Sequence, residues 1–597
     1  MAKRPIPLDP HGRSTLRDVL APPEGFQLQH ALGTAYSLDA ETLVTIPLFA
    51  AGMGAADIDK SVGVARIYEL GTRLTLLVQG DRISISKRWA NSRPLLRLVG
   101  DAVVPCSIKD GSFHPKLLIL EFASVEKARE RYFRVVISTR NLTADNSWDS
   151  LVVLDQERTG VSVTGLAETV SGLAQFVNDQ AHPAVEQCRR IGEALKDVRF
   201  QPLHGVADIE VRLFYPSCQN AEEIHRKIKG DDLLVISPFV RRGFLDGLAA
   251  QAGASKERRW LVTRPVDVPT SAFTKYQVFK ISDAAVPAHE SPDAERAQGR
   301  LVGLHAKIYL ASSKKGGTRL VVTSANATPS GWTHNVEVAV TGVIKAAAMQ
   351  VQALLADDSS SEQRSFRSVL ERITPSAVEC EEPEPKWVKR VRRILAGAAA
   401  VGRIRKGPPQ IIGVTLNFMA DRGDWPDGVV VTMHLVGYQE RCAPLTRDKN
   451  RMCGSLEIDP SAELTPFVAL TLSYGDDAPV GVVLAMSLEG DIDWDREAAR
   501  KVLAHAARPA LYQELLWYFG VKGNSSGSTG GHDGKKPSKA RKAGPQLPIL
   551  EKVLQRVHGP NAKEEITTID SLLAGLSDAA EDKQLATMWR LVKESLK

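Results

Sequence analysis

The segment Gly303–Ser312, G-L-H-A-K-I-Y-L-A-S, places a histidine and a lysine two positions apart in an apolar run that is typical of a buried strand. The same pattern occurs in Phe113–Phe122, F-H-P-K-L-L-I-L-E-F. Because side chains alternate along a strand, His305 and Lys307 are predicted to share one face, and so are the two matching residues of the earlier segment. A lysine is costly to bury without an anion. The pattern therefore predicts a site for a negatively charged group.

A second pattern follows each of these segments. Val136–Thr143, V-I-S-T-R-N-L-T, and Val321–Thr328, V-V-T-S-A-N-A-T, match one for one in their hydrophobic, hydroxyl and asparagine positions. Each begins like a strand and then becomes polar at Asn141 or Asn326. Open α/β sheets bind ligands at such strand ends, so these residues are predicted to line an active-site wall.

The two patterns belong to two similar series of strand-like runs interleaved with helix-compatible sequence. The first series comprises residues 74–78, 101–105, 113–122 and 134–143, and the second comprises 231–240, 259–265, 303–312 and 319–328. Continuous Val, Ile and Leu runs are typical of strands covered on both faces, as in an α/β sheet. The sequence therefore predicts a duplicated α/β lobe, with one copy in residues 1–205 and the other in 206–345.

The rest of the chain is predicted to form additional units, which differ in composition. Charged, alternating and low-complexity stretches mark their boundaries. In order they are a basic helical connector (346–407, including K-W-V-K-R-V-R-R-I-L at 386–395), a β-rich, sandwich-like domain (408–490), a helical segment (491–521), a flexible basic linker (522–547) and a C-terminal helical tail (548–597).

The charge of the chain is concentrated in one segment. The formal net charge is +6, but residues 522–546 alone carry six Lys and Arg against one Asp. An anionic polymer as a partner must therefore be inferred from local sites, since net charge governs solubility and steering. The N-terminal residues lack the apolar region of a signal peptide, and the most apolar run, 43–56, is interrupted by Pro47 and two glycines. We expect a cytoplasmic protein that does not enter the membrane.

Paired His-x-Lys motifs, each followed by a hydroxyl residue and an asparagine at a strand end, resemble the phospholipase D superfamily. Within it, the sequence is more similar to bacterial HKD-family nucleases and tyrosyl-DNA phosphodiesterase than to the lipid enzymes. The resemblance extends from about residue 30 to residue 345. It implies two α/β lobes packed as a pseudo-dimer, and a phosphodiester reaction that needs neither a metal nor another cofactor.

The resemblance also implies roles for individual residues. One histidine attacks phosphorus to form a phosphohistidine, and the other protonates the leaving oxygen and then activates water. His114 is assigned as nucleophile and His305 as general acid and base, although the two roles are open to exchange. Four residues would bind the nonbridging oxygens, namely Lys116, Lys307, Asn141 and Asn326, while Glu337 would orient an imidazole.

The sequence departs from the family pattern in two places. The full pattern has an aspartate five residues after each lysine, but these positions hold Glu121 and Ser312. The tyrosyl-DNA phosphodiesterase type also lacks the aspartate in its second motif. This shared absence favours nucleic acid as the substrate. The first half also lacks an evident counterpart of Glu337, for which Asp145 and Asp149 are the candidates.

Other polar residues near these motifs are candidates for substrate binding. They are Ser138, Thr139, Arg140, Ser324, Arg241 and Arg264. The arginines also have an ordinary structural interpretation, as a solvated rim. The same holds for the asparagines of the motifs, as turn or cap residues, and for Glu337, as an ion-paired carboxylate. A single histidine in an apolar strand is usually a core residue, but two in matched contexts favour function. Trp332 is expected to pack beneath the loop of Asn326.

The function expected from these residues is a metal-independent DNA nuclease. The family implies a bacterial anti-phage or restriction system, with an ATPase or helicase partner bound through the C-terminal region. Two alternatives remain: a phospholipase or phosphatidyltransferase that uses the same residues, and a nucleic-acid-binding subunit with a vestigial site. The intact His114, Lys116, His305 and Lys307 argue against the second alternative.

Overall fold

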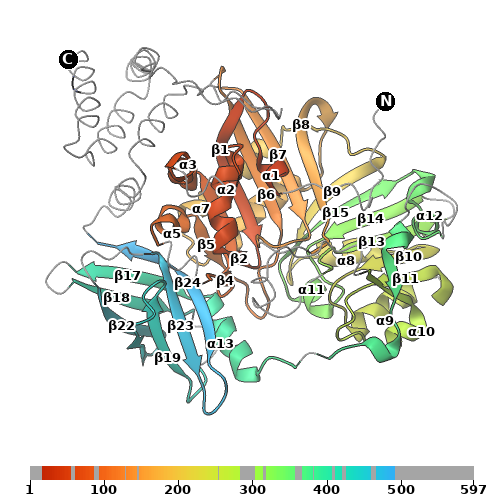
Figure 1. The fold of residues 1–597 in the computed structure, drawn as a ribbon. Coiled ribbons are helices and arrows are strands. Elements are labelled where there is room, and N and C mark those ends of the chain that lie inside the picture. The colour runs from red at the N-terminus through yellow and green to blue at the C-terminus, as the bar shows by residue number, and fades with distance from the viewer. Residues whose placement is uncertain are drawn as a thin grey trace, which may run out of the picture.

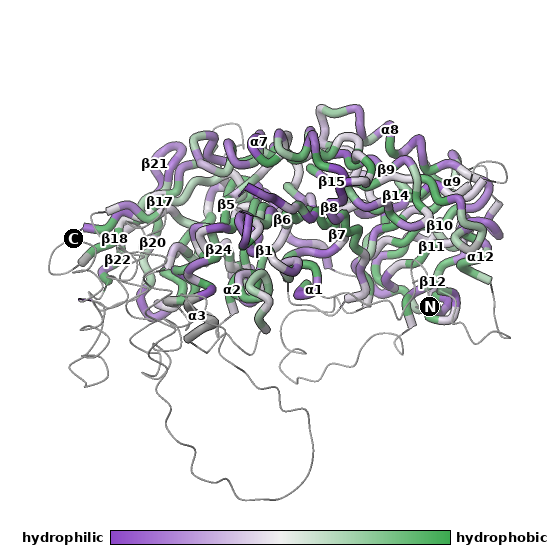
Figure 2. The backbone as a smooth tube through the Cα atoms, turned by 90° about the horizontal axis from the view of Figure 1, so that it is seen from above, coloured by the Kyte–Doolittle hydropathy of each residue, from purple (hydrophilic) through white to green (hydrophobic). Residues whose placement is uncertain are grey.

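The computed structural model describes residues 16–54, 61–86, 93–127, 129–143, 147–252, 255–282, 303–313, 317–356, 366–380, 382–405, 410–419, 425–458, 465–490 and 590. Within these residues the chain has a mixed α/β fold with three sheets, which lie in a row (Figures 1 and 2). The predicted units 491–521 and 522–547, and all of 548–597 except Arg590, lie outside the described residues. None of the described helices is both long and apolar enough to cross a membrane.

The six-stranded sheet lies in the middle of the row. Its order is β5 (Val103–Cys106), β3 (Leu74–Gln79), β1 (Phe26–Ala35), β6 (Leu117–Ser124), β7 (Arg131–Ser138) and β8 (Leu151–Val161). β1 is parallel to β3 and antiparallel to β6. One face packs on α1 (Leu16–Leu20), α2 (Ala40–Ala50), α3 (Ser61–Gly71) and α5 (Arg93–Gly100), and the other on α6 (Leu166–Gly172) and α7 (Pro183–Leu195). The expected two-sided burial is therefore present.

The eight-stranded sheet repeats this order and adds a strand at each edge. It runs β16 (Leu370–Arg372), β12 (Gln277–Ile281), β11 (Arg259–Val262), β10 (Asp232–Ile236), β13 (Ile308–Ser313), β14 (Gly317–Thr323), β15 (Glu337–Ile344) and β9 (Val206–Phe214). β10 is parallel to β11 and antiparallel to β13, as β1 is to β3 and β6. The helices of this half are α8 (Asn220–Lys227), α9 (Arg242–Gln251), α10 (Thr270–Lys275), α11 (Pro329–Thr333) and α12 (Val351–Leu354).

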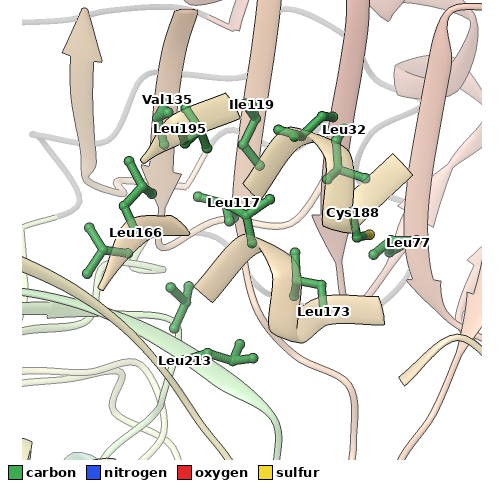
Figure 3. Close-up of a cluster of buried hydrophobic side chains, with 14 of the residues drawn as sticks. Leu32, Leu77, Leu117, Ile119, Val135, Leu166, Leu173, Cys188, Leu195 and Leu213 are labelled. Atoms are coloured by element: carbon green, nitrogen blue, oxygen red, sulfur yellow. The ribbon is translucent and has the colours of Figure 1, made fainter. Parts of the chain in front are cut away.

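These two sheets share a hydrophobic core. Val211 and Leu213 of β9 and Val338 of β15 are buried in the same cluster as α6, α7 and the strands β6 and β7. Figure 3 shows Leu213 near Leu166 on one side of this cluster, with Leu117 beyond it. Two short parallel bridges, Phe113 to Val336 and Trp148 to Leu304, also join the halves. The sites at the ends of the two sheets are thus brought together by packing and by backbone hydrogen bonds.

The third sheet is built from the C-terminal part of the described chain. Its strands are β17 (Ala399–Arg405), β18 (Gln410–Asn417), β19 (Val430–Leu435), β20 (Ala443–Pro444), β21 (Thr446–Asp448), β22 (Arg451–Ile458), β23 (Phe467–Ser473) and β24 (Val480–Glu489). Buried and exposed residues alternate along most of them, and helix α13 (Lys386–Ala396) packs on the resulting core. Short strands β2 (Leu38–Asp39) and β4 (Ile83–Ser84) join this sheet to the first half, since Ile83 pairs with Val483.

Three features of the structure differ from the expected organisation of the chain. β16, within the predicted connector 346–407, belongs to the eight-stranded sheet, and β17, also within it, belongs to the third sheet. β16 pairs with β12, far away in the chain, whereas β17 pairs both with the next strand, β18, and with the distant β24, so local composition did not reveal their sheets. The region 408–490 was expected to be sandwich-like, but its strands β18 to β24 form one hydrogen-bonded sheet of ten strands together with β17 and the short β2 and β4, with a single core.

Candidate active site

The two His-x-Lys motifs lie immediately before their strands, which corrects the expectation that they lie inside them. β6 begins at Leu117 and β13 at Ile308. Pro115 has no N–H to give to a ladder, and Thr34 Oγ1 instead donates to the Pro115 carbonyl at 2.9 Å and accepts from the Leu117 N–H at 2.8 Å. The motif residues are therefore extended but free of regular pairing, so their side chains are available to the site.

His114 is held by a carboxylate from the other half of the molecule. Its Nδ1 lies 2.8 Å from Glu337 Oε2, and its backbone N–H donates to the Val336 carbonyl at 2.9 Å. Lys116 Nζ lies 3.0 Å from His114 Nε2 and donates to the His114 carbonyl at 3.1 Å. Because an ionised carboxylate only accepts, Nδ1 carries the proton and Nε2 carries the lone pair. This is the tautomer that a nucleophilic imidazole requires.

Glu337 is itself fixed on both of its oxygens. Ser324 Oγ donates a short hydrogen bond to Oε2, and Asn335 Nδ2 donates to Oε1 at 3.0 Å. Asn335 Oδ1 accepts from the Ser112 N–H at 3.1 Å, which settles the orientation of its amide. Glu337 is fully buried. The prediction that it orients an imidazole therefore fits its position, and the imidazole is that of His114.

His305 is held by a backbone carbonyl from the first half. Its Nδ1 lies 2.7 Å from the Thr139 carbonyl oxygen, and Lys307 Nζ donates to the same oxygen at 3.2 Å. Lys307 also donates to the His305 carbonyl at 2.7 Å. Since a carbonyl only accepts, Nδ1 of His305 carries its proton and Nε2 is left for acid and base chemistry. Each imidazole is thus held at Nδ1 by the opposite half of the chain.

Burial dominates the electrostatics of the site. It lowers the pKa of His114 to about 4, an effect that Glu337 opposes and Lys116 and Lys307 reinforce. It also lowers the pKa of Lys116 to about 7 against the attraction of Glu337. The pKa of His305 is held well below its usual range by burial and then by the charges of Lys307 and Lys116. Both imidazoles are therefore neutral at pH 7, and the two pairs lie within electrostatic range of each other.

The two predicted asparagines have an unusual feature in common. The side-chain oxygens of Asn141 and Asn326 are buried and make no hydrogen bond within the described residues. A buried amide oxygen without a partner is costly, and an amide can turn to present its NH₂ group. Trp332 is buried beneath this loop, as expected, and donates from Nε1 to the Asn326 carbonyl at 3.1 Å. Each of the two amides is therefore suited to donate to a ligand.

The backbone around each histidine repeats the same pattern. The residue before His114 bridges to Val336, which precedes Glu337, and the residue before His305 bridges to Trp148, which precedes Asp149. Asp149 thus occupies the counterpart position of Glu337, although its carboxylate lies 4.0 Å from Arg140 Nε. The other candidate, Asp145, lies outside the described residues. The sites around the two histidines are therefore similar in backbone and unequal in side chains.

The remaining predicted substrate-binding residues have structural partners. Ser138 Oγ accepts from the Arg140 N–H, and the Thr139 hydroxyl forms hydrogen bonds with Ser150. The Ser324 hydroxyl donates to Glu337. Arg140 Nη2 donates to the Thr143 carbonyl at 2.7 Å. Arg241 is exposed and pairs with Asp267 at 3.5 Å, whereas Arg264 is buried with its guanidinium over the ring of Phe239. Thr139 contributes to the site through its backbone.

The positions that depart from the family pattern are structural. Glu121 pairs with Arg190 at 2.9 Å and Arg131 at 3.5 Å. Ser312 bonds with the Thr318 hydroxyl at 2.9 Å and accepts from a backbone N–H. These partners belong to the sheets and not to the histidine motifs, so the missing aspartates are replaced by groups that stabilise the sheets.

Three residues close to His114 were not predicted. The ring of Tyr36, directly after β1, lies 5.0 Å from that of His114. Gln79 Oε1, at the end of β3, accepts from the Phe113 N–H at 2.7 Å. Asn335 bridges Glu337 and Ser112, as described above. Tyr36 follows β1, which pairs with the motif strand β6, and Gln79 ends β3, which lies on the other side of β1. The rule that ligands bind at strand ends would have found them had β1 been predicted.

No family model matches the chain, and neither does any curated protein. Among solved structures, the chain is similar to yeast tyrosyl-DNA phosphodiesterase, at 13% identity and a TM-score of 0.35, over 56% of this chain and 87% of that one. It is also similar to phosphatidylserine synthase from Haemophilus influenzae Rd KW20, at 11% identity and a TM-score of 0.32, over 58% of this chain and 83% of that one. Both neighbours are members of the phospholipase D superfamily, to which the paired motifs were compared above.

Proposed function

We propose that this chain is a phospholipase D superfamily phosphodiesterase, with its two similar halves forming a pseudo-dimer around one active site. The observation that carries the proposal is the crosswise support of the two imidazoles. Glu337 of the second half holds Nδ1 of His114, and the Thr139 carbonyl of the first half holds Nδ1 of His305. Both Nδ1 atoms are thus occupied, which leaves the Nε2 atoms for chemistry, with Lys116 Nζ 3.0 Å from that of His114.

The reaction that suits these groups has two steps. Nε2 of His114 attacks phosphorus, the bond to the leaving oxygen breaks, and His305 gives that oxygen a proton. His305 then takes a proton from water, whose oxygen attacks phosphorus and breaks the phosphorus–nitrogen bond. The negative charge of a bound phosphodiester raises the pKa of His305, which supplies the protonated form that the first step needs.

The cations and amides of the site are proposed to bind the nonbridging oxygens. Lys116 and Lys307 are buried beside the imidazoles, where a lysine charge is stabilised by an anion. Asn141 and Asn326, whose amide oxygens have no partner within the described residues, would turn their NH₂ groups toward the same oxygens. The charge that develops on phosphorus would thus be matched by fixed groups of opposite sign.

DNA is the proposed substrate, because the second motif lacks the aspartate in the manner of the tyrosyl-DNA phosphodiesterase type. A place in a bacterial anti-phage or restriction system, with an ATPase or helicase partner bound through the C-terminal region, is proposed on the family resemblance alone. The competing candidates, a phosphatidyltransferase and a vestigial binding subunit, are outcomes of the experiment that follows.

The test uses the purified full chain with labelled single- and double-stranded DNA in EDTA, beside His114→Ala and His305→Ala. We expect cleavage in chelator by the unmodified chain alone, with a phosphohistidine trapped on His114. Cleavage that EDTA abolishes would refute the mechanism. A parallel incubation with phosphatidylglycerol vesicles tests for headgroup release, which without DNA cleavage would establish the lipid enzyme. Failure of every substrate to label a histidine would leave the vestigial subunit.

A further inference from the structure

The N–H of Phe113, next to the proposed nucleophile, is held by a side chain whose own orientation is fixed. Gln79 Oε1 accepts from it at 2.7 Å. Gln79 Nε2 donates to Asp81 Oδ1 at 2.9 Å, so the amide cannot turn without losing both hydrogen bonds. Gln79 is buried, which raises the cost of leaving either end unpaired. Asp81 therefore determines how Gln79 holds the backbone beside His114.

Asp81 needs cationic partners, because its side chain is only 2% exposed. A buried carboxylate is stable when it is paired. One partner is its neighbour Arg82, whose Nε lies 3.3 Å away. The other is Arg392 of helix α13, whose Nη1 lies 3.7 Å from the carboxylate and 3.4 Å from the Asp81 carbonyl. A residue of the C-terminal unit thus completes a network that ends at the active site.

A second route leads from Asp81 to the same histidine. The guanidinium of Arg82 lies 5.1 Å from the centre of the Tyr36 ring, and that ring lies 5.0 Å from the ring of His114. The position of Arg82 depends on Asp81, so the aromatic contact depends on it too. Both the backbone and the ring of His114 are therefore linked to one buried carboxylate.

Helix α13 is docked closely enough to place Arg392. The carbonyl of Ala396, its last residue, accepts from Asn178 Nδ2 at 2.8 Å and lies against Gly80, where any Cβ would overlap it. The other side of Arg392 is held by Glu384, 3.1 Å from its Nε. Its side chain is 17% exposed, so the pairing with Asp81 is largely shielded from water.

We infer that Gln79, Asp81 and Arg392 form a clamp through which the C-terminal unit fixes the position of His114. They are positioning residues, since none of them touches the reacting atoms. The clamp makes the third sheet and α13 part of the catalytic apparatus. The inference deepens the proposed function and rests on the role given there to His114.

The experiment compares Arg392→Gln with Arg393→Gln in the full chain. Arg393 is the matched control, because it lies on the same helix and pairs with Asp110 of the first half at 2.8 Å, but both partners are well exposed. Two quantities are measured: hydrogen exchange of the peptide containing Phe113, which needs no catalysis, and the single-turnover rate of phosphohistidine formation. Gln79→Leu removes the link to Phe113 without altering α13, and Arg392→Lys restores a cation.

In Arg392→Gln and Gln79→Leu we expect about tenfold faster exchange at Phe113 and about tenfold slower phosphohistidine formation, with little change in KM. Arg392→Lys should recover part of both losses, and Arg393→Gln should match the unmodified chain. Unchanged exchange at Phe113 in Gln79→Leu would overturn the clamp, as would equal effects of the two arginine substitutions. If the Arg392→Gln variant does not fold, the exchange and labelling rates of Gln79→Leu decide whether the clamp exists. Faster exchange with no phosphohistidine in any form would refute the proposed function and leave the clamp standing.

Discussion

Two imidazoles of one site are held by acceptors of different charge. Glu337 presents a full negative charge to Nδ1 of His114, whereas the Thr139 carbonyl presents only a dipole to Nδ1 of His305. A carboxylate stabilises the cation that His114 becomes when its Nε2 bonds to phosphorus. The dipole of a carbonyl stabilises a cationic imidazole less, so His305 can gain and lose a proton more freely. The inequality supports His114 as nucleophile and His305 as acid and base.

Replacing Glu337 by glutamine tests this difference. Glu337→Gln keeps the shape but removes the charge, so phosphohistidine formation should slow by about 10²- to 10⁴-fold. The measurement is single-turnover labelling of His114. The control is Glu210→Gln on the adjacent strand β9, where the carboxylate pairs with Lys227 at 2.7 Å at the surface. Equal rates for Glu337→Gln and the control would contradict the assignment.

The lowered pKa values predict the pH dependence of kcat/KM. A histidine with its pKa lowered to about 4 stays neutral and nucleophilic down to that pH, so kcat/KM should fall only as the pH drops through about 4. Since the pKa of His305 is also lowered in the free enzyme, its protonated form becomes scarcer as the pH rises, and kcat/KM should decline on the alkaline side. Lys116, with its pKa lowered to about 7, loses its charge above that pH, and the decline should steepen there.

Lys116→Arg separates the two limbs of this profile. Arginine stays charged throughout, so the steeper decline above about pH 7 should move to higher pH while the acid limb stays in place. The measurement is kcat/KM across the pH range for both forms. An alkaline limb that does not move would show that another group titrates there.

The residues of the site differ in how far the sequence could predict them. His114, Lys116 and their counterparts follow from a repeated spacing, whereas Glu337 was assigned through the resemblance to the phospholipase D superfamily. Tyr36 and Gln79 carry no charge or spacing of that kind. Their contacts with the motif depend on which strands become neighbours, and β1, which separates β3 from β6, was not recognised. The backbone role of Thr139 has no residue-type signal at all.

At the scale of elements, the docking of helix α13 depends on one glycine. Gly80 follows β3 and faces the carbonyl of Ala396, so Gly80→Ala should destabilise the chain by about 1–3 kcal/mol through overlap. Gly247→Ala in helix α9 is the control, because a Cβ there meets nothing within 4 Å and alanine favours a helix by up to about 1 kcal/mol. Denaturant unfolding measures both. A neutral Gly80→Ala would show that α13 docks more loosely than described.

Elements whose pairing is local were easier to predict than those paired over long distances. The helix at Lys386–Leu395 was expected from its basic and apolar pattern and is present as α13. β16 and β17 were absorbed into a connector, although β17 also pairs with the next strand, β18, because their other partners, β12 and β24, lie far away in the chain. Alternation identifies a strand but does not say which sheet it joins.

On the scale of the whole molecule, the two halves are expected to unfold together. Leu213 of β9 lies in the core that the halves share, so Leu213→Ala should cost about 2–5 kcal/mol and speed hydrogen exchange in both β7 and β15. Leu245→Ala is the control, since Leu245 is fully buried in a core formed by the second half alone. Its effect on exchange should stay in that half. Exchange confined to one half in both variants would contradict a shared folding unit.

The carbonyl of Thr139 has an evolutionary consequence. Every amino acid has a backbone oxygen, so no codon change at position 139 deletes the acceptor that holds His305 and Lys307. Glu337, in contrast, is lost to any missense change. Under relaxed selection, changes at position 337 would thus remove the support of His114, whereas changes at position 139 would leave the backbone acceptor of His305 in place.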